Sequence, residues 1–324
     1  MSSTTTNNNN NDDDTNKRAK TTTTTIPKTE GRVALLQFKV TPSKTQNYQT
    51  ASTFLKKAAD AGASLAVLPE IWNGPYATAA FPEYAERIPG VGYQLDEEGG
   101  DGCSSPSVEL LLKEAKRYGM FIVGGSISER VSSSSTTTEK EDDKIYNTCI
   151  CIDPTGTIVA KHRKVHLFDI DVPGGITFKE SDTLSPGDSL TWFDAGEYLG
   201  KIGVGICYDI RFPEYALLLT QEQKCNVLIY PGAFNLTTGP AHWELLQKGR
   251  AVDNQCFVLT ASPARTEAPT TPPAGGDDDN DGEGGKTTYP HYTAWGHSTA
   301  IGPWGDVVAT CDEGEHLVVC DLDV

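Results

Sequence analysis

The sequence is poor in basic residues: 27 lysines and arginines stand against 44 aspartates and glutamates, which gives a net charge of −17. Nucleic-acid binding depends on basic patches that neutralise phosphates, so this balance argues against nucleic acid as a partner. Much of the negative charge lies in three polar stretches, 96–101, 131–144 and 266–286. These have the composition of loops. We therefore interpret the acidity as a solvated surface and predict no metal site.

Long apolar segments are also missing. No run approaches the roughly 20 residues that a membrane-spanning helix needs. The first twenty residues, MSSTTTNNNNNDDDTNKRAK, lack the apolar stretch of a secretory signal, and their acidic triplet disfavours a mitochondrial transit peptide. The eight cysteines contain no C-x-x-C pair and are too few for a dense disulfide framework. We expect no membrane association and a reducing, cytoplasmic location.

Hydrophobic residues make up 37% of the chain, and the shortage is uneven. Residues 1–30 form a Ser/Thr/Asn/Asp tract that cannot bury enough apolar surface to order itself, so we expect it to be disordered. Residues 31–324 read as one domain. The low-complexity stretches at 131–144 and 266–286 are expected to be surface loops, because long loops add little entropic cost to folding.

Strand and helix patterns alternate through the rest of the chain. VALLQF at 33–38 reads as a buried strand, and a helical spacing of apolar residues follows over 45–61. Pro106 and Gly119 bracket a well-defined helix. The segment 120–129 reads as a further strand. Crossover helices together with hairpin-like strand pairs predict an α/β fold in layers, with the helices outside.

Cys207 stands in the segment GVGICYDIRFP, residues 203–213, where a strand ends and a helix soon begins. Such an elbow brings the thiol near backbone N–H groups and a positive helix end. Both would lower the thiol pKa and hold an oxyanion. A buried structural cysteine is an equally weighted alternative. Gly203 and Gly205 lack the third glycine of a dinucleotide-binding loop, so that interpretation is weak.

A nucleophilic cysteine needs a base, and the sequence offers histidine and glutamate. His162 and His166 lie in H-R-K-V-H, which lacks the glutamate of a zinc-protease motif; we expect both to be satisfied structural histidines. Glu70 follows an apolar strand and is either a surface cap or a buried base. Lys164 lies between the histidines, and Glu180 by itself is an ordinary loop acid.

Glu70, Lys164 and Cys207 would stand at three strand ends. Burial raises a glutamate pKa, so such a group can act as base and acid near neutrality. A lysine ammonium supplies a fixed positive charge for a developing oxyanion, and a thiolate is a nucleophile. Together the three residue types suit acyl transfer through a covalent intermediate.

The sequence resembles the carbon–nitrogen hydrolase (nitrilase) superfamily, and within it the omega-amidase branch, over residues 31–324. The matching stretches are LPEIWNGPY (68–76), KHRKVHLFDIDVPGGITFKES (161–181), LSPGD (184–188), GVGICYDIRFPE (203–214), YPGAFNLTTGPAHWELLQKGRAVDNQ (230–255), TASPAR (260–265) and AWGHST (294–299). The resemblance implies a four-layer α-β-β-α sandwich and a homodimer paired through helices.

The resemblance also implies roles for single residues. Glu70 matches the family's general base and proton donor, Lys164 the catalytic lysine and Cys207 the nucleophile. Glu180 matches a supporting glutamate that holds the lysine and the substrate. The backbone N–H of Tyr208 matches an oxyanion donor.

Three further positions, Arg211, Phe234 and Thr238, match those that bind the substrate's distal carboxylate in the omega-amidase branch. A planar guanidinium fits a carboxylate through two parallel hydrogen bonds. The structural alternative for Arg211 is an ion pair with a surface acid such as Glu214.

An omega-amidase would hydrolyse 2-oxoglutaramate and 2-oxosuccinamate to the 2-oxo diacid and ammonia through a cysteine thioester, with no metal or redox cofactor. The alternative within the superfamily is another amidase or nitrilase, such as the deaminated-glutathione amidase type. An alternative of another class is a non-catalytic interaction protein on the same scaffold, which would predict loss of a triad residue.

Overall fold

The computed structural model describes residues 31–95, 103–132, 143–171, 173, 177–267 and 289–324. The tract expected to be disordered, residues 1–30, lies outside the described residues, as do most of the two low-complexity loops. The loop expected at 131–144 is shorter at both ends, because Val131 and Lys144 are the end residues of paired strands.

Two mixed sheets form the centre of the molecule. The first has the order β15 (His316–Asp321), β1 (Arg32–Gln37), β2 (Leu65–Val67), β3 (Phe121–Val123), β5 (Lys144–Ile152) and β4 (Ile127–Val131), with β6 (Ile158–Arg163) also paired to β5. The second has the order β14 (Val307–Thr310), β13 (Thr299–Ile301), β12 (Phe257–Ala261), β11 (Val227–Pro231), β10 (Lys201–Val204) and β9 (Thr191–Asp194). A separate hairpin joins β7 (Asp169–Asp171) to β8 (Thr177–Lys179).

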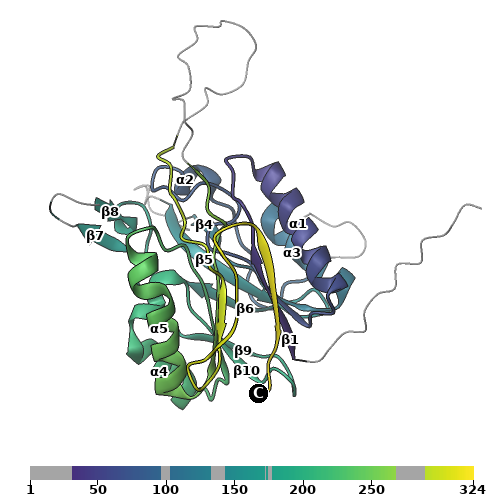
Figure 1. Ribbon diagram of the computed structural model, residues 1–324. Coiled ribbons are helices and arrows are strands. Elements are labelled where there is room, and N and C mark those ends of the chain that lie inside the picture. Colours follow the sequence, from purple (N-terminus) through teal and green to yellow (C-terminus); the bar gives the residue numbers. More distant parts are fainter. Residues whose placement is uncertain (1–30, 96–102, 133–142, 172, 174–176, 268–288) are drawn as a thin grey trace, which may run out of the picture.

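Helices cover the outer faces of both sheets (Figure 1). The helices α1 (Lys44–Asp60) and α3 (Pro106–Tyr118) lie on the first sheet, and α4 (Pro213–Gln221) and α5 (Thr238–Asn254) on the second. A one-turn helix, α2 (Phe81–Tyr84), lies before β4. This is the four-layer α-β-β-α sandwich that the resemblance implied. In the described part of the chain, no helix combines the length and apolarity needed to cross a bilayer.

The start and end of α3 follow from local signals that the sequence carries. The side chain of Ser105 accepts the backbone N–H of Val108, Pro106 takes the first helical position, and Gly119 ends the helix in the left-handed conformation at φ 59°. The strand expected at 120–129 is two strands instead. The chain bends at Gly125, which has φ 62°, and a Cβ there would lie 2.1 Å from the carbonyl oxygen of Pro69.

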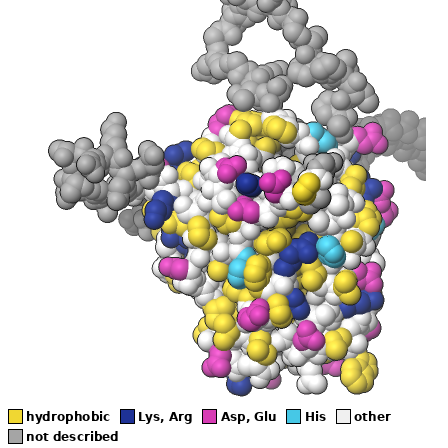
Figure 2. Space-filling model, turned by 90° about the vertical axis from the view of Figure 1, so that its left-hand side faces the viewer, with side chains coloured by type: hydrophobic (Ala, Val, Ile, Leu, Met, Phe, Trp, Pro, Cys, Tyr) yellow, Lys and Arg dark blue, Asp and Glu magenta, His cyan; other side chains and the backbone are white. Residues whose placement is uncertain are grey.

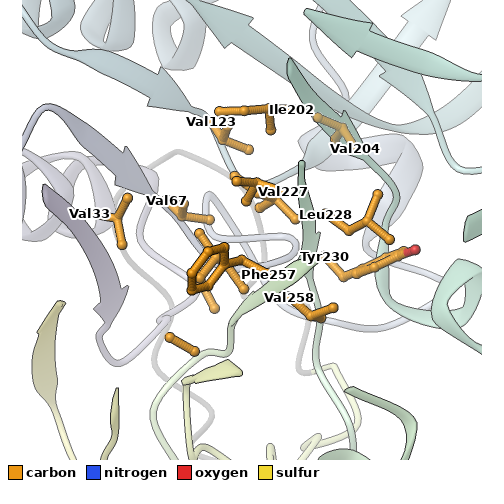
Figure 3. Packing of buried hydrophobic residues seen from close by; sticks show 14 of the residues in the cluster. Val33, Val67, Val123, Ile202, Val204, Val227, Leu228, Tyr230, Phe257 and Val258 are labelled. Atoms are coloured by element: carbon orange, nitrogen blue, oxygen red, sulfur yellow. The ribbon is translucent and has the colours of Figure 1, made fainter. Parts of the chain in front are cut away.

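The main hydrophobic core lies between the two sheets. Along β1, Val33 and Leu35 point into this core, whereas Ala34 and Leu36 pack toward the outer helices. Both faces of the strand are therefore buried, as is typical of strands in a covered parallel sheet. Figure 3 shows side chains of the inter-sheet core, drawn from both sheets: Val33, Val67, Val123, Ile202, Val204, Val227 and Val258.

Candidate active site

Three chain segments that leave the ends of strands bring Glu70, Lys164 and Cys207 together. Glu70 follows β2, Lys164 comes directly after β6, and Cys207 follows β10. The Nζ atom of Lys164 lies 3.0 Å from Oε1 of Glu70 and 2.9 Å from each carboxylate oxygen of Glu180. The side chains of all three charged residues are fully buried. An ammonium held between two buried carboxylates is the centre of the site.

The carboxylate of Glu70 is fixed by donors from two other segments. Asn147 Nδ2 donates to Oε1 at 2.9 Å, and the backbone N–H of Ala233 donates to Oε2 at 2.8 Å. Burial raises the pKa of Glu70 above its ordinary value, although the Lys164 charge opposes the shift. Of the two alternatives left open for Glu70, a surface cap or a buried carboxylate, the structure shows the buried one. Such a carboxylate can exchange a proton near neutral pH.

Glu180 is not an ordinary loop acid. Its Oε2 accepts the backbone N–H of Phe168 at 2.7 Å, and its Oε1 accepts the hydroxyl of Tyr76 at 2.7 Å. Burial alone would lower the pKa of Lys164, but the charges of Glu180 and Glu70 outweigh it and raise that pKa. The lysine is therefore held as a cation throughout the neutral pH range.

Cys207 sits on a tight elbow between β10 and α4. Its φ of 48° lies in the left-handed region, which is uncommon for a residue other than glycine. The turn is crowded, because a Cβ on Gly205 would lie 2.6 Å from the ring of Tyr230, and one on Gly232 would lie 3.3 Å from Cα of Cys207. Residues held in such conformations cluster at functional sites.

The sequence predicted that this elbow lowers the pKa of the Cys207 thiol, and that prediction is wrong. Burial and the neighbouring charge of Glu70 raise the pKa of Cys207 well above its usual range, and the Lys164 ammonium only partly offsets them. Desolvation of the thiolate outweighs the nearby backbone donors. The thiol is therefore protonated at rest, and a nucleophilic role would need a base to remove its proton.

Asp209, two residues after Cys207, is a buried site residue that the sequence analysis missed. Its Oδ2 accepts the N–H of Ile206 at 2.9 Å and lies 3.1 Å from Nε2 of His162. Its Oδ1 accepts the N–H of His166 at 2.9 Å and lies 2.8 Å from that residue's Nδ1. The two histidines are satisfied, as expected. Their spacing on either side of Lys164 was the available signal for a shared partner.

Arg211 lies in the same turn, and its guanidinium lies over two aromatic rings. The guanidinium carbon is 5.3 Å from the ring centre of Tyr208 and 5.1 Å from that of Phe234. Both Nη atoms lie 3.3 Å from Nδ1 of His242, which sequence reasoning missed. No ion pair joins Arg211 to Glu214 among the described residues, so the structural alternative is not observed. The half-buried cation is suited to bind an anion.

The other two predicted binding residues lie beside the start of α5. Phe234 packs against Trp243 with ring centres 5.0 Å apart. Thr238 begins α5, and its N–H and hydroxyl both donate to Oδ1 of Asn235, at 2.9 and 3.1 Å. Tyr208 occupies the first turn after the elbow, where backbone N–H groups have no acceptor within the helix. Substrate contacts at these positions stay predictions.

Two tyrosines outside the predicted set complete the site. The rings of Tyr76 and Tyr292 lie 4.6 Å apart, and Phe178 stacks on Tyr76 at 5.6 Å. The hydroxyl of Tyr292 donates to the carbonyl oxygen of Ala233, whose N–H binds Glu70. Burial raises the pKa of both phenols, so they act as hydrogen-bond donors. In the described residues, no cluster of three or more metal-ligating side chains occurs.

Comparison with known proteins identifies the family. The model of the family described as carbon-nitrogen hydrolase matches residues 32–324. The chain is 46% identical over 293 residues to omega-amidase NIT2 of Xenopus tropicalis, covering 90% of this chain and 88% of that protein. It is 45% identical over 296 residues to omega-amidase NIT2 of Homo sapiens, covering 91% and 90%.

A solved structure agrees with these relatives. Nit3 of Saccharomyces cerevisiae, described as a member of branch 10 of the nitrilase superfamily, superimposes with a TM-score of 0.70 at 39% identity and covers 90% of this chain and 89% of its own. The family match, the sequence identities and the shared fold agree. The chain belongs to the carbon–nitrogen hydrolase family.

Proposed function

We propose that the protein is an omega-amidase. The observation that carries the proposal is the position of Lys164 Nζ between the carboxylates of Glu70 and Glu180, beside a buried cysteine on a strained elbow. This arrangement supplies a base, a fixed cation and a nucleophile. The relatives named omega-amidase match nine-tenths of the chain, which supports this branch of the family.

In the proposed reaction, Glu70 takes the thiol proton as Cys207 Sγ attacks the amide carbonyl carbon. The ammonium of Lys164 and the backbone N–H of Tyr208 stabilise the negative oxygen of the tetrahedral intermediate. Glu70 then gives its proton to the departing nitrogen, which leaves as ammonia and a thioester remains. Glu70 next takes a proton from water as the water attacks the thioester. Collapse of the second intermediate releases the carboxylic acid and restores the thiol.

Glu180 has a supporting role in this scheme, since it holds Lys164 in place. Arg211, Phe234 and Thr238 bind the carboxylate at the far end of the substrate. The proposed substrates are therefore 2-oxoglutaramate and 2-oxosuccinamate, each a linear amide with a distal carboxylate. Side chains of this chain and water supply every step, so the proposed mechanism uses no metal or redox cofactor.

We also propose that the protein forms a homodimer through α4 and α5. Leu217 and Leu218 on α4 and Leu245 and Val252 on α5 are exposed. Figure 2 views the molecule from the side on which Figure 1 shows these helices, and hydrophobic side chains lie between charged ones there. Light scattering tests this: Leu245→Glu is expected to shift the protein from dimer to monomer, and a wild-type monomer contradicts the proposal.

Residues 31–324 are proposed to form one hydrolase domain. We further propose a cytoplasmic location, which the absence of any disulfide among the eight cysteines supports.

The activity is tested with a panel of 2-oxoglutaramate, succinamate, deaminated glutathione and a simple nitrile. Ammonia release is expected to be fastest from 2-oxoglutaramate. Cys207→Ala is expected to abolish turnover while the protein stays folded, and Cys103→Ala serves as the matched thiol control with full activity. Preference for deaminated glutathione or the nitrile would assign another branch of the family. Turnover by folded Cys207→Ala would overturn the mechanism.

A further inference from the structure

Asp209 connects the two arms of the candidate site. One arm is the elbow, because Asp209 Oδ2 accepts the N–H of Ile206, the residue before Cys207. The other arm is the segment after β6, because Oδ1 accepts the N–H of His166, two residues after Lys164. The side chains of His162 and His166 contact the same carboxylate from both sides of Lys164. The arms come from different sheets, and Asp209 bridges them.

We propose that Asp209 is a positioning residue that sets the separation between Cys207 Sγ and Lys164 Nζ, and with it the reactivity of the thiol. This rests on the proposed role of Cys207 as nucleophile. The carboxylate makes four contacts of 2.8 to 3.1 Å and is fully buried. Hydrogen bonds to an ionised group are short and roughly twice as strong as neutral ones, so they resist displacement of either arm.

The backbone at Cys207 needs such support. A non-glycine residue at φ 48° persists only when its surroundings over-determine it. The bond from the Ile206 N–H to Asp209 fixes the peptide between Gly205 and Ile206, one residue before this strained residue. The elbow is further held by α5, because Arg250 Nε donates to the carbonyl oxygen of Ile210 at 2.8 Å. Of these two supports, only Asp209 also contacts the segment that carries Lys164.

Reaction of Cys207 with iodoacetamide measures this reactivity without any substrate. The sulfur displaces iodide from the reagent's methylene carbon, and the thiol proton passes to Glu70. In Asp209→Asn the alkylation rate of folded protein is expected to fall on the order of tenfold to a hundredfold, since small misplacements of reacting groups cost this much. The kcat values for an acidic and a neutral amide should fall by a similar factor, with little change in KM.

His166→Ala is the second variant, since it removes one side-chain contact to Asp209, together with the stacking of His166 on Phe212, and keeps the backbone bond to Asp209. It should lower the alkylation rate by a smaller factor. The matched controls are Asp312→Asn and His316→Ala. They alter an aspartate–histidine pair at the protein surface, in which His316 Nε2 lies 2.6 Å from Asp312 Oδ1. Both controls should alkylate like the wild type. Mass spectrometry confirms that Cys207 is the modified residue, and thermal unfolding confirms the fold.

The proposal is overturned if folded Asp209→Asn alkylates at the wild-type rate, even with a lower melting temperature, because the residue is then only structural. If Asp209→Asn does not fold, an unchanged rate in His166→Ala overturns it. Failure of the proposed function looks different: wild-type Cys207 would resist alkylation, and Cys207→Ala would keep its activity.

Discussion

The hydroxyl of Tyr76 donates to Oε1 of Glu180 at 2.7 Å, and the same oxygen accepts Lys164 Nζ at 2.9 Å. Tyr76 therefore fixes the carboxylate that fixes the lysine. Contacts with Phe178 and Tyr292 orient its ring, so that its hydroxyl points at Glu180. This relationship links the aromatic side of the site to its charged centre.

Removing this hydroxyl tests the link. Tyr76→Phe keeps the ring contacts but leaves a buried carboxylate one donor short, a loss of about 1.5–3 kcal/mol for a charged acceptor. We expect kcat/KM to fall by roughly 10-fold to 100-fold, because each 1.36 kcal/mol is a factor of ten. Tyr84→Phe is the matched control, since its hydroxyl donates to the Pro42 carbonyl at the surface. Equal activity in both variants would show that Tyr76 only packs.

The raised pKa of Glu70 predicts the pH dependence of the reaction. In the proposed mechanism Glu70 must be ionised to take the thiol proton, so activity should be lost as the pH falls through its folded-state pKa. Burial raises that pKa, and the acid limb of kcat/KM should therefore lie above the value of about 4.3 for a free glutamate. An acid limb at or below that value would contradict the desolvated base.

Substitution of the base gives a matching test. Glu70→Gln keeps the size of the side chain and its ability to accept the Ala233 N–H. The expected loss in kcat is about 10²–10⁴-fold, the usual contribution of a general base. Glu214 is exposed, so Glu214→Gln is the control and should leave the profile unchanged. Near wild-type turnover in Glu70→Gln would assign the proton transfer to another group.

The acidic insertion is expected to be dispensable for chemistry, but the chain just after it is not. Replacing residues 266–286 by a short linker should keep kcat within a few-fold, because loop length changes closure entropy only slowly. Extending the deletion through Tyr292 should lower kcat strongly, since Tyr292 contacts the Ala233 carbonyl beside Glu70. If the short replacement alone reduces kcat in a folded protein, the insertion itself shapes the site.

The sequence predicted those parts of the fold that depend on neighbouring residues. The strand at 33–38 is β1, one residue displaced, because both of its faces are buried and its residues are almost all apolar. The helix after Pro106 ends at Gly119 as expected, since capping is local. The hairpin of β7 and β8 was missed, because each strand has only 3 residues, too few for an alternating pattern to be recognised, and its burial is slight.

The candidate site was likewise predictable only where neighbouring residues carry the signal. Glu70, Lys164 and Cys207 stand in recognisable segments, so the resemblance implies their roles from the sequence alone. Asp209 and Tyr292 were missed because their importance comes from contacts between segments distant in the sequence. The raised pKa of Cys207 was missed for a related reason: a local elbow predicts a lowered pKa, whereas the surrounding burial decides the direction.

Arg211 is expected to decide substrate choice. Its guanidinium lies over the rings of Tyr208 and Phe234 and makes no ion pair with Glu214, so its charge is available to a substrate carboxylate. Truncating a charged hydrogen bond in a desolvated site costs about 2–5 kcal/mol. Arg211→Met should therefore lower kcat/KM for 2-oxoglutaramate by roughly 30-fold to several-thousand-fold, at a factor of ten for each 1.36 kcal/mol.

The loss should be selective, because Arg211→Met leaves Glu70, Lys164 and Cys207 in place. A neutral amide of similar length should be hydrolysed at nearly the wild-type rate. Arg211→Lys should recover only part of the difference, since an ammonium cannot offer two parallel donors or stack on Tyr208 and Phe234 as a guanidinium does. The measurement is kcat/KM for the acidic and the neutral amide in all three proteins. If kcat/KM falls by the same factor for both substrates, Arg211 supports the elbow through its neighbours, including His242, and does not bind the carboxylate.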